Sequence, residues 1–318
     1  MKKNLLIGAL LLGAASFSML TGFDNTLTAQ DILAKSQEAG KALNEVSADA
    51  DINLDVDIAV PAADMSLGIQ ADGKEEIAAK MDPFGMQADM NMTVSLMGQN
   101  MVVDVSIYGI MEDDNTFSVY TKTAMEGEEA PQWTKTSTDS AQITQALEQA
   151  KNMTFDLSSL PFAFEVAPEA TDVNGTECYV LSATATWNDL YLLAQPYLEQ
   201  LPQEVPMDEL DSYSQLLSGL KFNMQTCVDT ETFRPMAVHL DVNGSDWTTI
   251  AALASSLFGT DENGNAYEVS MDVKAADIDI VYDYTTPVEI VLPEEAASAQ
   301  EADPSTLLDM VENADDAA

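Results

Sequence analysis

The sequence predicts an α+β protein organised around an antiparallel β-sheet. Apolar residues recur at every second position over long stretches, which is the period of a strand with one buried face. Such stretches follow one another through short polar turns, as in residues 222–242, where Asp229 and Thr230 begin the turn of a β-hairpin. Helical patterns come between groups of strands and not after every strand, which favours hairpin connections over βαβ units.

Residues 1–23 have the layout of a secretory signal. Lys2 and Lys3 precede an apolar run, and small residues follow it. We therefore expect an exported protein that is secreted or held at the cell surface. Phe23 stands where the lipidated cysteine of a lipobox would be, so diacylglycerol anchoring at this position is chemically impossible. The apolar run continues to Phe23, which leaves an uncleaved anchor, and with it membrane proximity, as the alternative to a cleaved signal peptide.

The first predicted elements after the leader are a helix and a strand. The helix at residues 28–45 has Thr28 in the N-cap position and Asp31 three residues on. The strand at residues 47–60 alternates apolar residues with Asp or Asn, which predicts one buried face and one solvated face. Further strands are expected at residues 65–72, 86–96, 101–110, 116–123, 133–136, 176–187, 222–228, 236–242, 267–274, 278–284 and 288–292. Further helices are expected at residues 140–151, 190–201 with Asn188 as its cap, 210–220 and 246–258.

Acidic residues dominate the charge of the chain. Asp and Glu number 54 against 12 Lys and Arg, for a formal net charge of −42. Nucleic acid and anionic membrane surfaces are excluded as partners, because binding phosphates requires clustered Lys or Arg. The plain interpretation is solubility outside the cell, with cation binding and a salt-adapted surface as alternatives. Residues 24–293 are expected to form a single domain, and residues 294–318 an acidic disordered tail.

No catalytic residues are predicted. His239 is the only histidine, and no nucleophile or G-x-S-x-G motif accompanies it, so its pattern fits a surface or sheet-packing role. Paired carboxylates carry no specific signal in a chain with this many acids. We therefore expect a protein that is not an enzyme and that needs no cofactor.

One segment has the alternate spacing of oxygen ligands in calcium loops. Asp261, Asn263 and Asn265 lie two residues apart, but Ala266 stands where an EF-hand requires glycine. The Asn263-Gly264 pair is typical of a polar hairpin loop, which is the preferred interpretation. No metal site is predicted.

Cys178 and Cys227 are the only cysteines, an even number in a chain with an export signal. A disulfide between them is a candidate if their two strands are antiparallel neighbours. Two thiols on opposite faces of the sheet are the alternative.

The chain is rich in methionine, and several methionines share a predicted strand face. Thioethers without histidine or thiolate support indicate a soft apolar lining more than a copper site. A sheet face lined by such residues and covered by amphipathic helices is suited to a lipid cavity. The candidate lining residues are Ile52, Leu54, Val56, Ile58, Met90, Met92, Val94, Met224, Val238 and Leu240.

Several segments resemble the LolA/LppX-like lipoprotein-carrier superfamily, and most of all a group of uncharacterised exported proteins from Gram-positive bacteria. They are TAQDILAKSQEAGKALNEV, NGTECYVLSATAT, CVDTETFRPMAVHLDV and YDYTTPVEIVLPEEA, within residues 28–296. The resemblance implies a strongly curved antiparallel sheet, a half-barrel, with helices packed on its concave face. In characterised relatives the space between sheet and helices holds acyl chains. Phe23 departs from the lipidated pattern, and no partner-docking site can be assigned from the resemblance.

Two hypotheses follow from these observations. The first is an exported protein that binds a hydrophobic ligand, a lipid or an acylated molecule, without chemistry. The second is a structural or interaction module of the cell envelope whose core is filled by its own side chains. The sequence assigns no protein partner to either.

Overall fold

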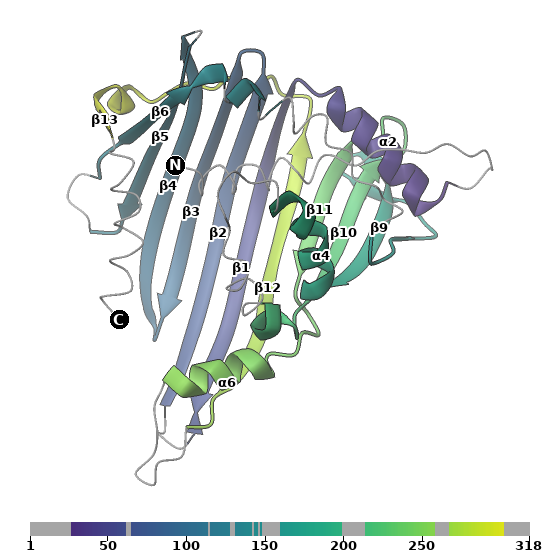
Figure 1. The fold of residues 1–318 in the computed structure, drawn as a ribbon, viewed down its shortest axis with the longest axis vertical. Helices are drawn as coiled ribbons and strands as arrows, with labels where there is room; N and C mark the ends of the chain where they lie inside the picture. The colour runs from purple at the N-terminus through teal and green to yellow at the C-terminus, as the bar shows by residue number, and fades with distance from the viewer. Residues whose placement is uncertain are drawn as a thin grey trace.

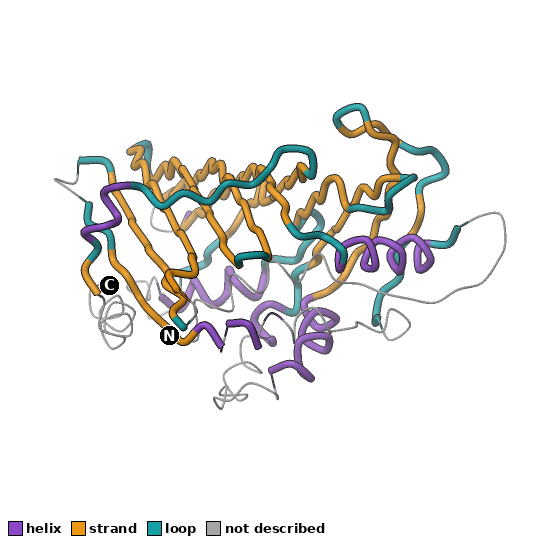
Figure 2. Tube along the Cα trace, turned by 90° about the horizontal axis from the view of Figure 1, so that it is seen from above, coloured by secondary structure: helices purple, strands orange, loops and turns teal. Residues whose placement is uncertain are grey.

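The computed structural model describes residues 27–61, 65–113, 115–127, 131–141, 143–145, 147, 160–198, 214–257 and 267–301. Its centre is a large curved sheet that does not close into a barrel (Figures 1 and 2). The described part of the chain contributes thirteen strands to this sheet. The predicted antiparallel sheet is therefore confirmed. The leader at residues 1–23 and the chain beyond residue 301 lie outside the described residues, as does most of the calcium-like segment.

The strands are long in the centre of the sheet and short at its edges. They are β1 (Glu45–Val60), β2 (Met65–Met81), β3 (Phe84–Leu96), β4 (Gln99–Asp113), β5 (Thr116–Met125), β6 (Thr134–Asp139), β7 (Glu165–Val166), β8 (Thr171–Val173), β9 (Thr176–Thr186), β10 (Lys221–Asp229), β11 (Pro235–Asp241), β12 (Ser270–Asp283) and β13 (Gln300–Glu301). The helices include α2 (Ala29–Lys41), α4 (Trp187–Leu198), α6 (Thr248–Leu257) and the short 3₁₀ helix η3 (Glu294–Ser298), and described residues at 140–141, 143–145, 147 and 214–217 are helical as well.

Two antiparallel runs of strands meet in the middle of the sheet. The order is β13-β6-β5-β4-β3-β2-β1-β12-β11-β10-β9-β7, with β8 paired to β9. The pairing of β1 with β12 joins the two runs, so the first long strand of the chain lies beside the last. The hairpin predicted at residues 222–242 is confirmed as β10 and β11.

Strand pairing gives the sheet an apolar face and a polar face. Directly paired residues point to the same side, and successive residues alternate between sides. Ile52 pairs with Ile278 on one neighbouring strand and with Gly73 on the other, and this side is the apolar face. Asp51 pairs with Asp279 and Lys74 at the next position, and this side is the polar face.

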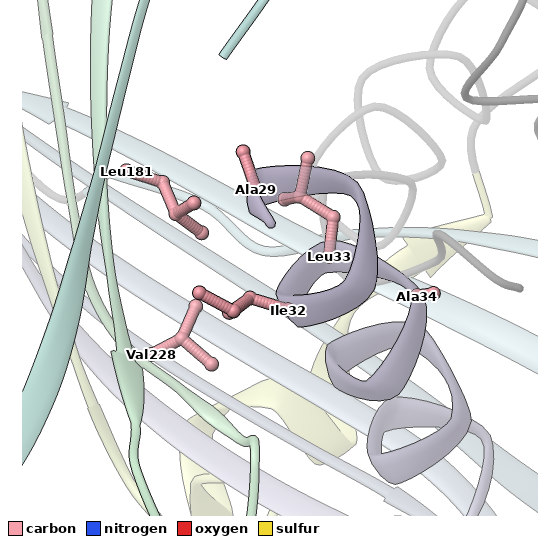
Figure 3. Packing of buried hydrophobic residues seen from close by; sticks show 6 residues of the cluster. All are labelled: Ala29, Ile32, Leu33, Ala34, Leu181 and Val228. Carbon is pink, nitrogen blue, oxygen red and sulfur yellow. The ribbon is translucent and has the colours of Figure 1, made fainter. Parts of the chain in front are cut away.

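Helices α2, α4 and α6 lie on one side of the sheet (Figure 2). The N-terminus of α2 has a capping box: Thr28 Oγ1 accepts a hydrogen bond from the Asp31 amide at 3.2 Å, and Asp31 accepts one from the Thr28 amide at 2.9 Å. On α2, Ile32 is fully buried against Leu181 and Val228, which lie on the apolar face of β9 and β10 (Figure 3). The α2 side of the sheet is therefore its apolar side.

The segment after β12 crosses the polar face at one end of the sheet (Figure 1, yellow). Ile290 and Leu292 pack against a small cluster that includes Tyr108 and Trp133, and β13 then pairs in parallel with β6. The strand expected at residues 288–292 was wrong, because these residues bury apolar side chains on the sheet and do not pair with it.

The expectation of disorder from residue 294 onward was also wrong for its first part. Residues 294–301 form η3 and β13, and Ala296 is fully buried in the same cluster. This burial and the hydrogen bond from the Gln300 amide to the Trp133 carbonyl, at 3.1 Å, explain why residues 294–301 are ordered. The acidic composition of the segment did not indicate this contact.

Some element boundaries also differ from the prediction. The strands expected at residues 267–274 and 278–284 are a single strand, β12, which keeps its pairing with β1 through an irregularity next to Val56. Helix α4 begins at Trp187, and its cap is Thr186 and not Asn188. Thr186 and Asp189 exchange hydrogen bonds at its first turn, at 2.8 and 3.2 Å.

Candidate functional site

All ten candidate lining residues lie on the apolar face. In the row through Ile52, strand pairing places Met92 two strands away on one side, and Leu240 and Met224 on the other. The remaining six follow from the same pairings, since each stands an even number of residues from a member of this row on its own strand. The sheet therefore brings together residues from β1, β3, β10 and β11 as one continuous surface.

Large hydrophobic side chains remain exposed on this face, toward one end of β2 to β5. Exposed fractions are 51% for Met65, 47% for Leu96, 43% for Met101 and 51% for Met125. The pairings of Leu96 with Ile69 and of Met101 with Val94 continue the apolar rows. Leu96, Met101 and Met125 occupy neighbouring positions on β3, β4 and β5, and exposed apolar groups of this kind are a feature of ligand grooves and of interaction surfaces.

Small residues form the middle of the apolar face. Ala48, Ala50 and Ala71 are buried, and Gly73 beside them carries no side chain. Bulkier side chains, such as those of Ile52 and Met92, surround these positions. The middle of the apolar face therefore consists of short side chains, and longer flexible or branched side chains surround it.

One carboxylate interrupts the apolar face. Glu75 pairs with Ala50 of β1 and with Met90 of β3, so its side chain projects among apolar neighbours. Burial raises the pKa of Glu75 above its ordinary value. The sequence prediction missed this residue because it ended the strand at Asp72. A partial signal was present, since Ile77 and Ala79 return to the apolar phase of the same strand.

His239 lies on the polar face between two carboxylates. Its Nδ1 is 2.8 Å from Asp279 Oδ1 and its Nε2 is 3.2 Å from Asp241 Oδ2. Burial lowers the pKa of His239, but the hydrogen bonds and charges of Asp279 and Asp241 outweigh it, and the pKa is raised overall. Both ring nitrogens are occupied by carboxylates, so the imidazole is held in place and has no nucleophile as its partner.

Shallow hollows occur on the polar face. One, of about 490 Å³, is open to solvent and is lined by residues of β9, β10 and β11 that include Thr184, Asn223 and Asp241. A second lies at the β2–β3 end, beside Gln70 and Ser95. The lining of the first hollow also includes His239.

The acidic residues of β1 are partly paired on the polar face. Lys74 Nζ lies 2.7 Å from Asp51 Oδ1, and Lys274 Nζ lies 2.6 Å from Asp57 Oδ2. These exposed pairs contribute little to stability individually. Within the described residues, no group of three or more His, Cys, Asp or Glu side chains is arranged to hold a metal ion.

Cys178 and Cys227 lie on the same face of neighbouring strands and are not bonded to each other in the structure. Cys178 pairs with Asp229 and Cys227 with Val180, so the two cysteines are diagonal neighbours on the polar face. The alternative that placed them on opposite faces was wrong. Burial, followed by the nearby Cys227 and Asp229, raises the pKa of Cys178 to about 11. The disulfide stays a prediction.

Among the helices of the described residues, none is both long enough and apolar enough to cross a bilayer.

Comparison with known proteins identifies a sequence family and several solved structures of low sequence identity to this chain. The sequence profile of a family of unknown function, DUF6612, matches residues 28–246. No curated protein matches the sequence. Lipoprotein LppX of Mycobacterium tuberculosis is 10% identical, with a TM-score of 0.33, over 82% of this chain and 96% of LppX. LprF of Mycobacterium bovis is 13% identical, with a TM-score of 0.35, over 82% of this chain and 95% of LprF.

A third solved structure is a β-barrel-like protein with a domain of unknown function, DUF1849, from Brucella abortus. It is 12% identical, with a TM-score of 0.25, over 76% of this chain and 98% of its own.

Proposed function

Because the chain belongs to DUF6612, a family without an assigned function, we propose from its own surface that it binds a hydrophobic ligand, a lipid or an acylated molecule. The ligand lies on the apolar face of the sheet. Binding involves no covalent chemistry, and the protein acts outside the cytoplasm, as its export signal indicates.

The observation that carries this proposal is the exposure of large apolar side chains at one end of the apolar face. Met65, Leu96, Met101 and Met125 are each about half exposed, although they continue rows that contain buried or half-buried residues such as Ile69, Val94 and Val103. Exposing such side chains to water costs free energy that a hydrophobic ligand recovers. Methionine adapts its shape to its contacts, which suits flexible chains of varied length.

The location of the ligand follows from the side on which the helices lie. The proposed space is between the concave side of the curved sheet and the helices, as the resemblance to the LolA/LppX-like superfamily implies. Apolar burial contributes about 0.8 kcal/mol per CH₂ group before the cost of ordering the ligand.

A second candidate function has its own support. Ala48, Ala50 and Ala71 are already buried, which favours a face that is covered by the protein itself. In that case the chain is a structural or interaction module of the cell envelope and carries no ligand.

Native mass spectrometry of the purified full chain separates the two candidates. We expect bound lipid, released on unfolding, and saturable binding of an uncharged fluorescent fatty-alcohol analogue. The double variant Leu96→Gln, Met101→Gln should weaken binding of the analogue at least tenfold, since both side chains are exposed and replacing them leaves the core unchanged. Ser95→Gln on the polar face is the matched control and should bind like the wild type. A bare mass and no binding of the analogue would support the structural module instead.

A further inference from the structure

Glu75 is surrounded by apolar groups on three strands. Its direct partners on the apolar face are Ala50 and Met90, and its neighbours along β2 on that face are Gly73 and Ile77. The pairing of Ala50 with Ile280 extends the apolar surroundings onto β12. A carboxylate in such a position loses much of its hydration and is unfavourable unless a partner compensates it.

The described residues supply no such partner. Among them, Glu75 forms neither a hydrogen bond nor an ion pair, and burial is the cause of its raised pKa. Lys74 and Lys274, on the same part of the sheet, are engaged with aspartates of the polar face. Lys35 and Arg234 lie over aromatic rings, at 4.5 and 5.4 Å from the ring centroids. The carboxylate is therefore available to a group that comes from outside the described chain.

The overall charge of the protein points to the sign of that group. A net charge of −42 repels anionic amphiphiles and attracts cationic ones at long range. At short range, a carboxylate in apolar surroundings forms its strongest hydrogen bonds with a charged donor. Long-range and local electrostatics favour the same ligand chemistry.

We propose that Glu75 accepts a charge-assisted hydrogen bond from the ammonium group of the ligand, so that the preferred ligand is an amphiphile with an amine beside its hydrocarbon chain. This proposal rests on the proposed function, because the hydrocarbon chain occupies the apolar face described above. Gly73, next to Glu75 on the same face, is covered by the Ile52 side chain, whose Cβ lies 3.4 Å from where a Cβ of residue 73 would stand, so the surroundings of the carboxylate are apolar on this side as well. Rows of apolar residues run away from Glu75 toward Met92, Val94 and Met101, in the direction that the chain would follow.

The test compares three probes with one hydrocarbon chain and different polar ends: dodecylamine, dodecanol and dodecanoate. Their binding to the full chain is measured by calorimetry at neutral pH, below their micelle concentrations and at two salt concentrations. We expect the amine to bind about tenfold to a hundredfold more tightly than the alcohol, and the carboxylate to bind least. A local hydrogen bond at a partly buried site should keep most of this preference at the higher salt concentration.

Two substitutions in adjacent positions localise the effect. Glu75→Gln should remove most of the preference for the amine and leave binding of dodecanol nearly unchanged. Glu76→Gln removes the same charge from the polar face of the same strand, where Glu76 pairs with Asp49, and should keep the wild-type preference.

The outcomes distinguish the two proposals. If the amine shows no preference, or if Glu75→Gln keeps the wild-type preference, the role of Glu75 is overturned while hydrophobic binding stands. If none of the three probes binds the wild type, the proposed function fails together with this inference.

Discussion

Glu75 and Glu76 are neighbours in the chain but project from opposite faces of β2. Glu75 faces Ala50 and Met90, whereas Glu76 faces Asp49 and Asp89. Strand geometry alone produces this difference, because successive side chains alternate between the faces of a sheet. The pair therefore offers two substitutions of the same chemistry in two different environments.

The first prediction concerns the stability cost of Glu75. Burial raises the pKa of Glu75 in the folded protein, so folding favours the protonated carboxyl group. The protein is therefore most stable with respect to this group below the ordinary pKa of 4.5, and it loses stability as pH rises through the higher pKa of the folded state. Glu75→Leu should therefore raise the melting temperature at pH 7 more than at pH 4. Tyr282, a titratable group on the apolar face of β12, has its pKa raised above 10 by burial and does not interfere in this range.

The control for this prediction is Glu76→Leu on the polar face, which should give a smaller change at pH 7 than Glu75→Leu. Thermal unfolding followed by circular dichroism at the two pH values measures both variants. A melting temperature for Glu75→Leu below that of the wild type at pH 7 would show that the carboxylate is stabilising, against the prediction.

A second prediction concerns His239 and its two carboxylates. Burial acts to lower its pKa, but Asp279 and Asp241 raise it above 6.5 overall. Stability from this group is complete below about pH 6.5 and declines as pH rises through the value in the folded protein. His239→Gln should therefore destabilise the protein more at pH 5.5 than at pH 8.5. Asp279→Asn should reduce the same pH dependence, whereas equal losses for His239→Gln at both pH values would contradict it.

The third prediction concerns thiol reactivity. Cys178 is fully buried and its pKa is raised to about 11, so little thiolate is available at neutral pH. Ellman's reagent should react slowly with the native protein and rapidly with both thiols after unfolding in guanidinium. Zero thiols in the unfolded, unreduced protein would instead show that Cys178 and Cys227 form the disulfide that the sequence suggests.

A fourth prediction concerns the contact between α2 and the sheet. Ile32 is fully buried against Leu181 and Val228 (Figure 3). Ile32→Ala should lower the free energy of unfolding by about 2 to 5 kcal/mol, since it removes methylene groups and leaves a cavity. Gln30→Ala, at an exposed position of the same helix, should change it by less than about 0.5 kcal/mol. Urea denaturation measures both, and similar values for the two would show that α2 does not contribute to the core.

Local patterns were enough to predict much of the sheet. The alternation in β1 placed Ile52 and Leu54 on one face and Asp51 on the other, because burial of one side of a strand requires a period of two. The hairpin of β10 and β11 followed from its polar turn. The prediction of disorder failed where a contact with residues distant in the sequence outweighs the local preference of the chain. The acidic segment at residues 294–301 is ordered by burial of Ala296 and by pairing with β6.

The sequence by itself determined the antiparallel strands, their apolar and polar sides, and the membership of the ten candidate lining residues in the apolar set. These properties depend on the spacing of side chains along one strand, which is visible in the chain. Only the tertiary structure decided that β1 lies beside β12, that the two cysteines share a face, and that Glu75 stands alone among apolar neighbours. Such relationships depend on which strands become neighbours, and that choice is set by the packing of the whole sheet.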